Sequence, residues 1–213
     1  MKHYDSMTQA MTFALRAWST YGATCWVTFD SNEEKLDGLR AKLDEAYGLA
    51  LPPEKRRWRR SKKLPVAWGF STRVLGKPHS ISVLMLATQE AVSAPPESPF
   101  SREKWRTSLP ELGDFVMVKE PRERGDYAWS WKIQDRQMGL MSAHLTALVK
   151  HGDTHQLAAC CHEWARLYPA FGGVRRGLKR LFKSAAKLWV ATHKKPWPGP
   201  DPEQLPMMVG FKA

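Results

Sequence analysis

The sequence has no long apolar run. No segment approaches the roughly 18 to 20 apolar residues that cross a bilayer, and the N-terminal MKHYDSMTQA lacks the apolar stretch of a secretory signal. We therefore expect a cytoplasmic protein that does not bind a membrane.

Cysteine and cofactor motifs are scarce as well. The three cysteines, Cys25, Cys160 and Cys161, are odd in number and include an adjacent pair, which is not typical of a disulfide framework. The chain contains no P-loop, GxGxxG or GxSxG, so nucleotide hydrolysis, dinucleotide redox chemistry and hydrolase-fold catalysis have no support. No cofactor is expected.

Acidic residues are few relative to basic ones. Lys and Arg number 33 against 21 Asp and Glu, a formal net charge of +12. Such an excess favours polyanionic partners, which are nucleic acids or acidic membrane surfaces. The distribution of the charge along the chain is therefore more informative than its sum.

Residues 1–136 are predicted to form an α+β domain whose antiparallel sheet has about six strands, arranged in hairpins. One helix is predicted in this half, with Ser31 as its N-cap and Gly48 at its end. Residues 93–110 contain four prolines among polar neighbours, which favours an extended loop. The predicted strands cover residues 11–18, 24–30, 66–70, 81–87, 115–118 and 127–133.

Residues 137–192 are predicted to form a section of three helices. Helical spacing of apolar residues covers about 139–150, then a segment from Asp153 or Thr154 to before Pro169, then 174–192. The remainder, 193–213, is a Pro-rich tail that cannot form a helix or a central strand. It is expected to strap onto the body of the protein or to dock on a partner.

The first basic segment is EKRRWRRSKK, residues 54–63, interpreted as a loop. Seven cations in ten residues repel one another, and such a segment is best stabilised by an external polyanion. Arginine matches phosphate oxygens bidentately, and Trp58 could stack on an unpaired base; a solvated linker is the alternative. The predicted contacts are Lys55, Arg56, Arg57, Trp58, Arg59, Arg60, Lys62 and Lys63.

The second basic segment lies in the stretch between Glu163 and Asp201, which contains no acidic residue. A helix over 174–192 would bury one apolar face and turn a cationic face outward. Nucleic acid is the favoured ligand of that face; an anionic membrane, an acidic protein and a merely solvated surface are alternatives. The buried face would hold Val174, Leu178, Leu181, Phe182, Ala185 and Trp189, and the predicted contacts are Arg175, Arg176, Lys179, Arg180, Lys183 and Lys187.

Two further features of this half could bind ligands. The N–H groups of Gly172 and Gly173 could hold a phosphate at a helix N-terminus, although a glycine pair there is more often a tight turn. His151, His155 and Cys160 are of the types that bind zinc, together with Cys161 and His162, but their spacing matches no zinc motif. No metal site is therefore assigned.

Catalysis has weaker support than binding. The carboxylates near residues 114–135 show no spacing typical of a divalent-metal nuclease. Metal-independent cleavage of RNA would need only a His, Tyr or Lys, and His79, Tyr127 and His144 are the candidates. The alternating aromatics Tyr127, Trp129 and Trp131 could be a base-stacking platform, but the buried face of a sheet is the favoured interpretation.

The strings Tyr168-Pro169-Ala170-Phe171-Gly172-Gly173-Val174-Arg175-Arg176 and Trp197-Pro198-Gly199-Pro200-Asp201-Pro202 resemble uncharacterised proteins of bacterial plasmids and integrative elements. The resemblance implies a role in the replication, maintenance, transfer or regulation of mobile DNA. It implies no site residues.

These observations favour a protein that binds the backbone of DNA or RNA as a subunit of a nucleoprotein complex of a mobile element and that is not an enzyme. The alternatives are an enzyme that cuts or nicks phosphodiester bonds and an adaptor that binds an acidic protein.

Overall fold

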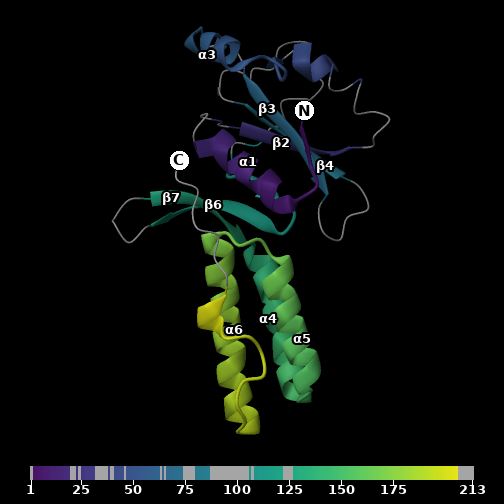
Figure 1. Cartoon of the computed structure of the whole chain (residues 1–213), viewed down its shortest axis with the longest axis vertical. Coiled ribbons are helices and arrows are strands. Elements are labelled where there is room, and N and C mark those ends of the chain that lie inside the picture. The colour runs from purple at the N-terminus through teal and green to yellow at the C-terminus, as the bar shows by residue number, and fades with distance from the viewer. Residues whose placement is uncertain are drawn as a thin grey trace. The chain divides into compact units, whose positions relative to one another are not determined.

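A computed structural model of the chain describes residues 2–19, 23, 25–31, 38, 41–45, 47–62, 64, 66–73, 80–86, 106, 108–121 and 127–205. The chain divides into two compact units, residues 1–113 and 114–213 (Figure 1). The predicted boundary at residue 136 therefore falls inside the second unit, because the hairpin before it packs with the C-terminal helices.

The first unit contains a four-stranded sheet of order β1-β3-β4-β2. β1 runs parallel to β3, whereas β4 is antiparallel to both of its neighbours. The helix α1 packs on β3. The elements of this unit are β1 (Lys2–Tyr4), α1 (Met7–Ser19), β2 (Cys25–Ser31), α3 (Pro53–Ser61), β3 (Ala67–Arg73) and β4 (Ser80–Leu86).

The predicted strand over residues 11–18 is wrong, because these residues lie within α1. Ala10, Met11, Ala14 and Ala17 are buried at helical spacing, and the ring of Phe13 meets Phe70 at 5.5 Å between centroids. The aromatic and β-branched composition suggested a strand, but the spacing of the small buried residues follows the helical period.

The predicted single antiparallel sheet of about six strands is also wrong. The described strands form two sheets rather than one, and the second has the order β5-β6-β7. The first sheet is not purely antiparallel either, because its β1 and β3 are parallel. The chain passes from the first unit to the second in the turn at Gly113–Asp114, between β5 and β6. The second sheet consists of β5 (Glu111–Leu112), β6 (Phe115–Pro121) and β7 (Tyr127–Ile133).

The predicted N-terminal helix is described only in part. Residues 38, 41–45 and 47 are helical, and Gly48 follows with a positive φ of 64°, as expected of a glycine that ends a helix. Ser31 is the last residue of β2. Most of the predicted loop at 93–110 lies outside the described residues.

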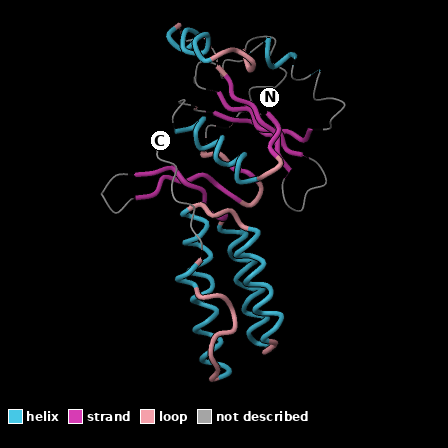
Figure 2. Tube along the Cα trace, in the orientation of Figure 1, coloured by secondary structure: helices cyan, strands magenta, loops and turns pink. Residues whose placement is uncertain are grey.

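The second unit contains the β6–β7 hairpin and three helices (Figure 2). The helix α6 packs on α4 and on β7. Gly152, with φ of 81°, ends α4, and the Asp153 side chain accepts a hydrogen bond from the Gln156 N–H (2.9 Å) to cap α5. The helices are α4 (Asp135–His151), α5 (Thr154–Leu167) and α6 (Gly172–His193), followed by the short 3-10 helix η3 (Pro202–Gln204).

The apolar face predicted for the last helix is confirmed. All six of its residues are buried, with Trp189 among the largest side chains of the core. The helix packs on α4 and β7, whose own buried apolar residues are Met141, Leu145 and Val149 on α4 and Trp131 and Ile133 on β7. The helical period of 3.6 residues therefore fixes which side of α6 is turned outward.

None of the helices among the described residues is both long enough and apolar enough to cross a bilayer.

Candidate nucleic-acid interface

The first basic segment forms the helix α3 rather than the predicted loop. Pro53 occupies the first turn, where its missing N–H costs nothing, and Glu54 also lies in that turn. Arg59 and Arg60 lie in the last turn, where the helix dipole favours cations. These local preferences offset part of the repulsion among the cations.

One side of α3 is turned toward the protein. Arg56, Arg59 and Arg60 are half-buried there. The Arg56 guanidinium donates a hydrogen bond to the Leu49 carbonyl, and a Cβ atom at Gly48 would lie 3.0 Å from Nη1 of Arg59. Arg56 and Arg59 therefore pack against the end of the preceding helical segment, and all three arginines are less accessible than the other cations of α3.

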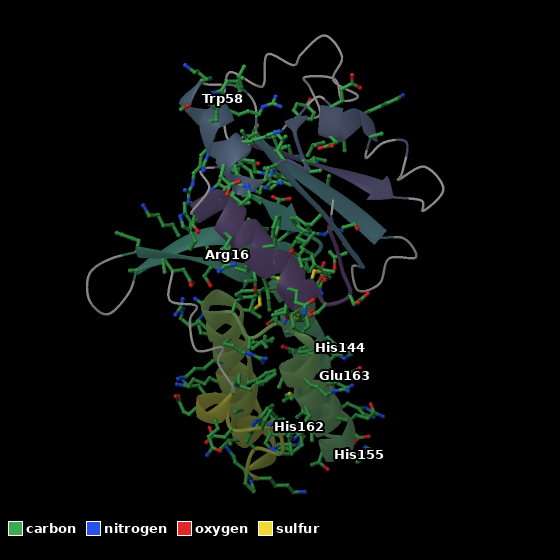
Figure 3. The ribbon with its side chains drawn as sticks, turned by 45° about the horizontal axis from the view of Figure 1, so that its top comes forward. Arg16, Trp58, His144, His155, His162 and Glu163 are labelled. Atoms are coloured by element: carbon green, nitrogen blue, oxygen red, sulfur yellow. The ribbon has the colours of Figure 1, made fainter. Side chains whose placement is uncertain are left out.

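The other side of α3 is exposed. Trp58 is 58% exposed and lies on this side (Figure 3), together with Lys55, Arg57 and Lys62. None of these three cations has a carboxylate partner within the part of the chain that the structure describes. Lys63, also predicted as a contact, lies outside that part. An exposed tryptophan between free cations is suited to stacking on a base.

The second basic segment forms a stripe along α6. Arg176, Arg180, Lys183 and Lys187 follow one another at helical spacings of four, three and four residues, and all four are exposed. We call these four residues the α6 stripe. Lys179 lies at its edge and is half-buried. The helix itself contains no acidic residue to neutralise the stripe.

Arg175, which was also predicted as a contact, does not lie on this exposed surface. It is only 5% exposed, and its guanidinium donates hydrogen bonds to the carbonyls of Ala165 (2.7 Å) and Tyr168 (2.9 Å). Burial lowers the pKa of the guanidinium. Arg175 therefore secures the end of α5 against α6.

Two carboxylates from elsewhere in the chain neutralise part of the stripe. Glu120 of β6 pairs with Arg176, and Glu203 of η3 pairs with both Lys179 and Lys183. Arg180 and Lys187 have no carboxylate partner among the described residues. The absence of acidic residues between Glu163 and Asp201 therefore does not leave the whole cationic face unpaired, because Arg176, Lys179 and Lys183 have carboxylate partners from outside that stretch.

These acidic partners are the residues that sequence reasoning missed. Glu120 lies 56 residues from Arg176, and Glu203 lies 24 residues from Lys179. Asp201 is the one local feature of the sequence that could have indicated the position of Glu203. Its side chain accepts a hydrogen bond from the Glu203 N–H (2.9 Å) and stabilises the turn that contains Glu203.

The glycine pair before α6 serves packing. The Gly173 N–H donates to the Ser130 hydroxyl (3.2 Å), so it is already occupied. A Cβ atom at Gly173 would lie 2.5 Å from the Trp131 carbonyl oxygen, so only glycine allows α6 to approach β7 this closely. The position suits a tight contact rather than a phosphate.

The aromatic residues of β7 divide between core and surface. Trp131 is buried, Trp129 is half-buried and Tyr127 is 61% exposed. The Lys119 ammonium lies 5.3 Å from the centroid of the Tyr127 ring. The interpretation as a buried face is therefore confirmed for Trp131 alone.

Of the weak catalytic candidates, the structure describes Tyr127 on β7 and His144 on α4. His79 lies outside the described residues. His144 lies on α4 (Figure 3), where its ring contacts Trp164 at 5.9 Å between centroids. Neither His144 nor Tyr127 contacts a carboxylate within the described ranges.

The cysteine and histidine residues of α4 and α5 do not converge. Across the described residues, no three His, Cys, Asp or Glu side chains are placed to hold a metal ion. His151 and His155 are exposed, whereas Cys161 is fully buried. Burial raises the pKa of Cys160 and raises that of Cys161 to about 12, so both thiols stay protonated at neutral pH.

No protein-family model, curated protein or solved structure matches the chain. The resemblance to proteins of mobile elements therefore stays a prediction.

Proposed function

We propose that this protein binds the phosphate backbone of a nucleic acid, with the α6 stripe as the principal contact and the exposed side of α3 as a second one. The observation that carries the proposal is the alignment of four exposed cations on α6, two of which, Arg180 and Lys187, have no carboxylate partner among the described residues. Free, aligned cations exchange their counterions for phosphates, which makes polyanion binding favourable at low salt.

The two surfaces would make different contributions. The α6 stripe offers charge without an exposed aromatic ring, which suits backbone contacts with little sequence selectivity. The side of α3 that carries Trp58 adds a ring that can stack on an unpaired base. A role as a nucleic-acid-binding subunit on mobile DNA is compatible with both contacts.

The test is a salt series with labelled single- and double-stranded DNA and RNA. In the double variant R180Q/K187Q, loss of two phosphate contacts should reduce the slope of log K against log salt concentration by about 1.8 for duplex DNA. The variant R166Q/K150Q is the matched control, because it removes the same charge from exposed positions on α5 and α4.

A slope reduced equally by both double variants would show that net charge alone matters and would contradict the proposal. Absence of binding by the unaltered protein at about 50 mM salt would contradict it outright.

An acidic protein is the second candidate partner, because cations of the α6 stripe and its edge already pair with the carboxylates of Glu120 and Glu203. An adaptor of this kind should bind nucleic acid weakly, and R180Q/K187Q should leave that weak binding almost unchanged.

A further inference from the structure

The Pro-rich tail forms a strap along α6. We define the strap as residues 194–205; Figure 1 shows it returning along the helix that precedes it. Lys194 ends α6 with a positive φ of 55°, which reverses the chain. The indole N–H of Trp189 donates to the Pro196 carbonyl (3.0 Å), and Leu205 is buried at the far end.

The strap presents one carboxylate to the basic helix. The indole N–H of Trp197 donates to the Pro200 carbonyl (3.2 Å), and Asp201 caps the following turn through the Glu203 N–H. With both ends of the strap held, Glu203 directs one carboxylate oxygen to Lys179 and the other to Lys183.

The ion pairs of Glu203 with Lys179 and Lys183 resemble the contacts that a phosphate group would make with the same two lysines. Lys179 and Lys183 lie one turn apart, about 6 Å along the helix axis, and a single anion bridges their ammonium groups. Hydrogen bonds from these two lysines lower the pKa of Glu203, so the carboxylate is charged at neutral pH. A phosphate that approached the same edge of α6 would have to displace it.

We propose that the strap is a built-in competitor of the nucleic-acid backbone, with Glu203 occupying two cations that phosphates would otherwise contact. This inference rests on the proposed function. The competitor is weak, because the three side chains are partly exposed and exposed ion pairs contribute little. It therefore tunes affinity, and release of the strap raises the number of available phosphate contacts by two.

The variant E203Q tests the strap, because it removes the charge while it keeps the shape of the side chain. Binding to duplex DNA should tighten about twofold to thirtyfold, and the salt slope should steepen by about 1.8. The control is E163Q, an equal charge change at an exposed position of α5 (Figure 3). In a K179Q/K183Q background, E203Q should have no effect.

The outcomes separate the two proposals. If E203Q and E163Q change binding equally, or if E203Q weakens it, the strap is no competitor, while the proposed function stands as long as R180Q/K187Q flattens the slope. If the unaltered protein and E203Q both fail to bind any of the four nucleic-acid types at about 50 mM salt, the proposed function itself is overturned.

Discussion

Replacement of Gly173 by alanine tests how α6 is held against the second sheet. The added Cβ would lie 2.5 Å from the Trp131 carbonyl oxygen and 3.0 Å from a carboxylate oxygen of Glu120. The carbonyl belongs to the backbone of β7, which pairs with β6 at Met117, so it cannot move without disturbing the hairpin. The variant should also weaken the hydrogen bond from the Gly173 N–H to Ser130.

The magnitude follows from opposing terms. Overpacking costs about 1–3 kcal/mol, whereas alanine gains at most about 1 kcal/mol over glycine in a helix. The middle of the overpacking range, about 2 kcal/mol, less a gain of up to about 1 kcal/mol, gives an expected loss of about 1–2 kcal/mol for G173A. Gly177 supplies the matched control, because its added Cβ would meet only the end of the Met138 side chain, at ordinary distances of 3.6 Å from the sulfur and 3.9 Å from the methyl carbon. G177A should gain about 0.5–1 kcal/mol.

Hydrogen exchange of the α6 amides measures this difference within the second unit. Exchange in G173A should be about tenfold faster than in the unaltered protein, and exchange in G177A should be several-fold slower. If G173A protects α6 as well as G177A does, the close approach of α6 to β7 is not what holds the helix.

Two further variants separate structural cations from binding residues. R175M should lower the free energy of unfolding in urea by about 1–3 kcal/mol, because the carbonyls of Ala165 and Tyr168 lose their donor. If R175M instead flattens the salt slope of nucleic-acid binding as R180Q/K187Q does, Arg175 is part of the interface. W58A should leave stability within about 0.5 kcal/mol but weaken binding of single strands by about 1–3 kcal/mol in fluorescence anisotropy, with little effect on duplexes; equal losses for both ligands would rule out stacking.

The sequence predicted α6 and its two faces because these depend on local spacing. Residues three or four apart share one side of a helix wherever the helix lies, so the buried set from Val174 to Trp189 could be identified without a fold. The strands of the β6–β7 hairpin were predicted for a similar reason, since alternation of apolar and polar side chains identifies a strand.

The same local reasoning failed where several patterns were compatible with one composition. Residues 11–18 are rich in aromatic and branched side chains, yet Met11, Ala14 and Ala17 are buried on one side of α1. The division of the strands into two sheets depends on which strands pair, and no short window of sequence contains that choice.

By itself, the sequence determined that Arg176, Arg180, Lys183 and Lys187 lie on the side of α6 opposite its apolar residues. Which cations of α6 remain available was decided only by tertiary structure: Arg175 is buried against the end of α5, Arg176 meets Glu120 from a distant strand, and Glu203 returns on the strap to Lys179 and Lys183. The charge of a side chain can be read from the sequence, whereas its neutralisation depends on which carboxylate lies beside it in the folded chain. Residues that pair across 20 or more positions become neighbours only when the chain folds.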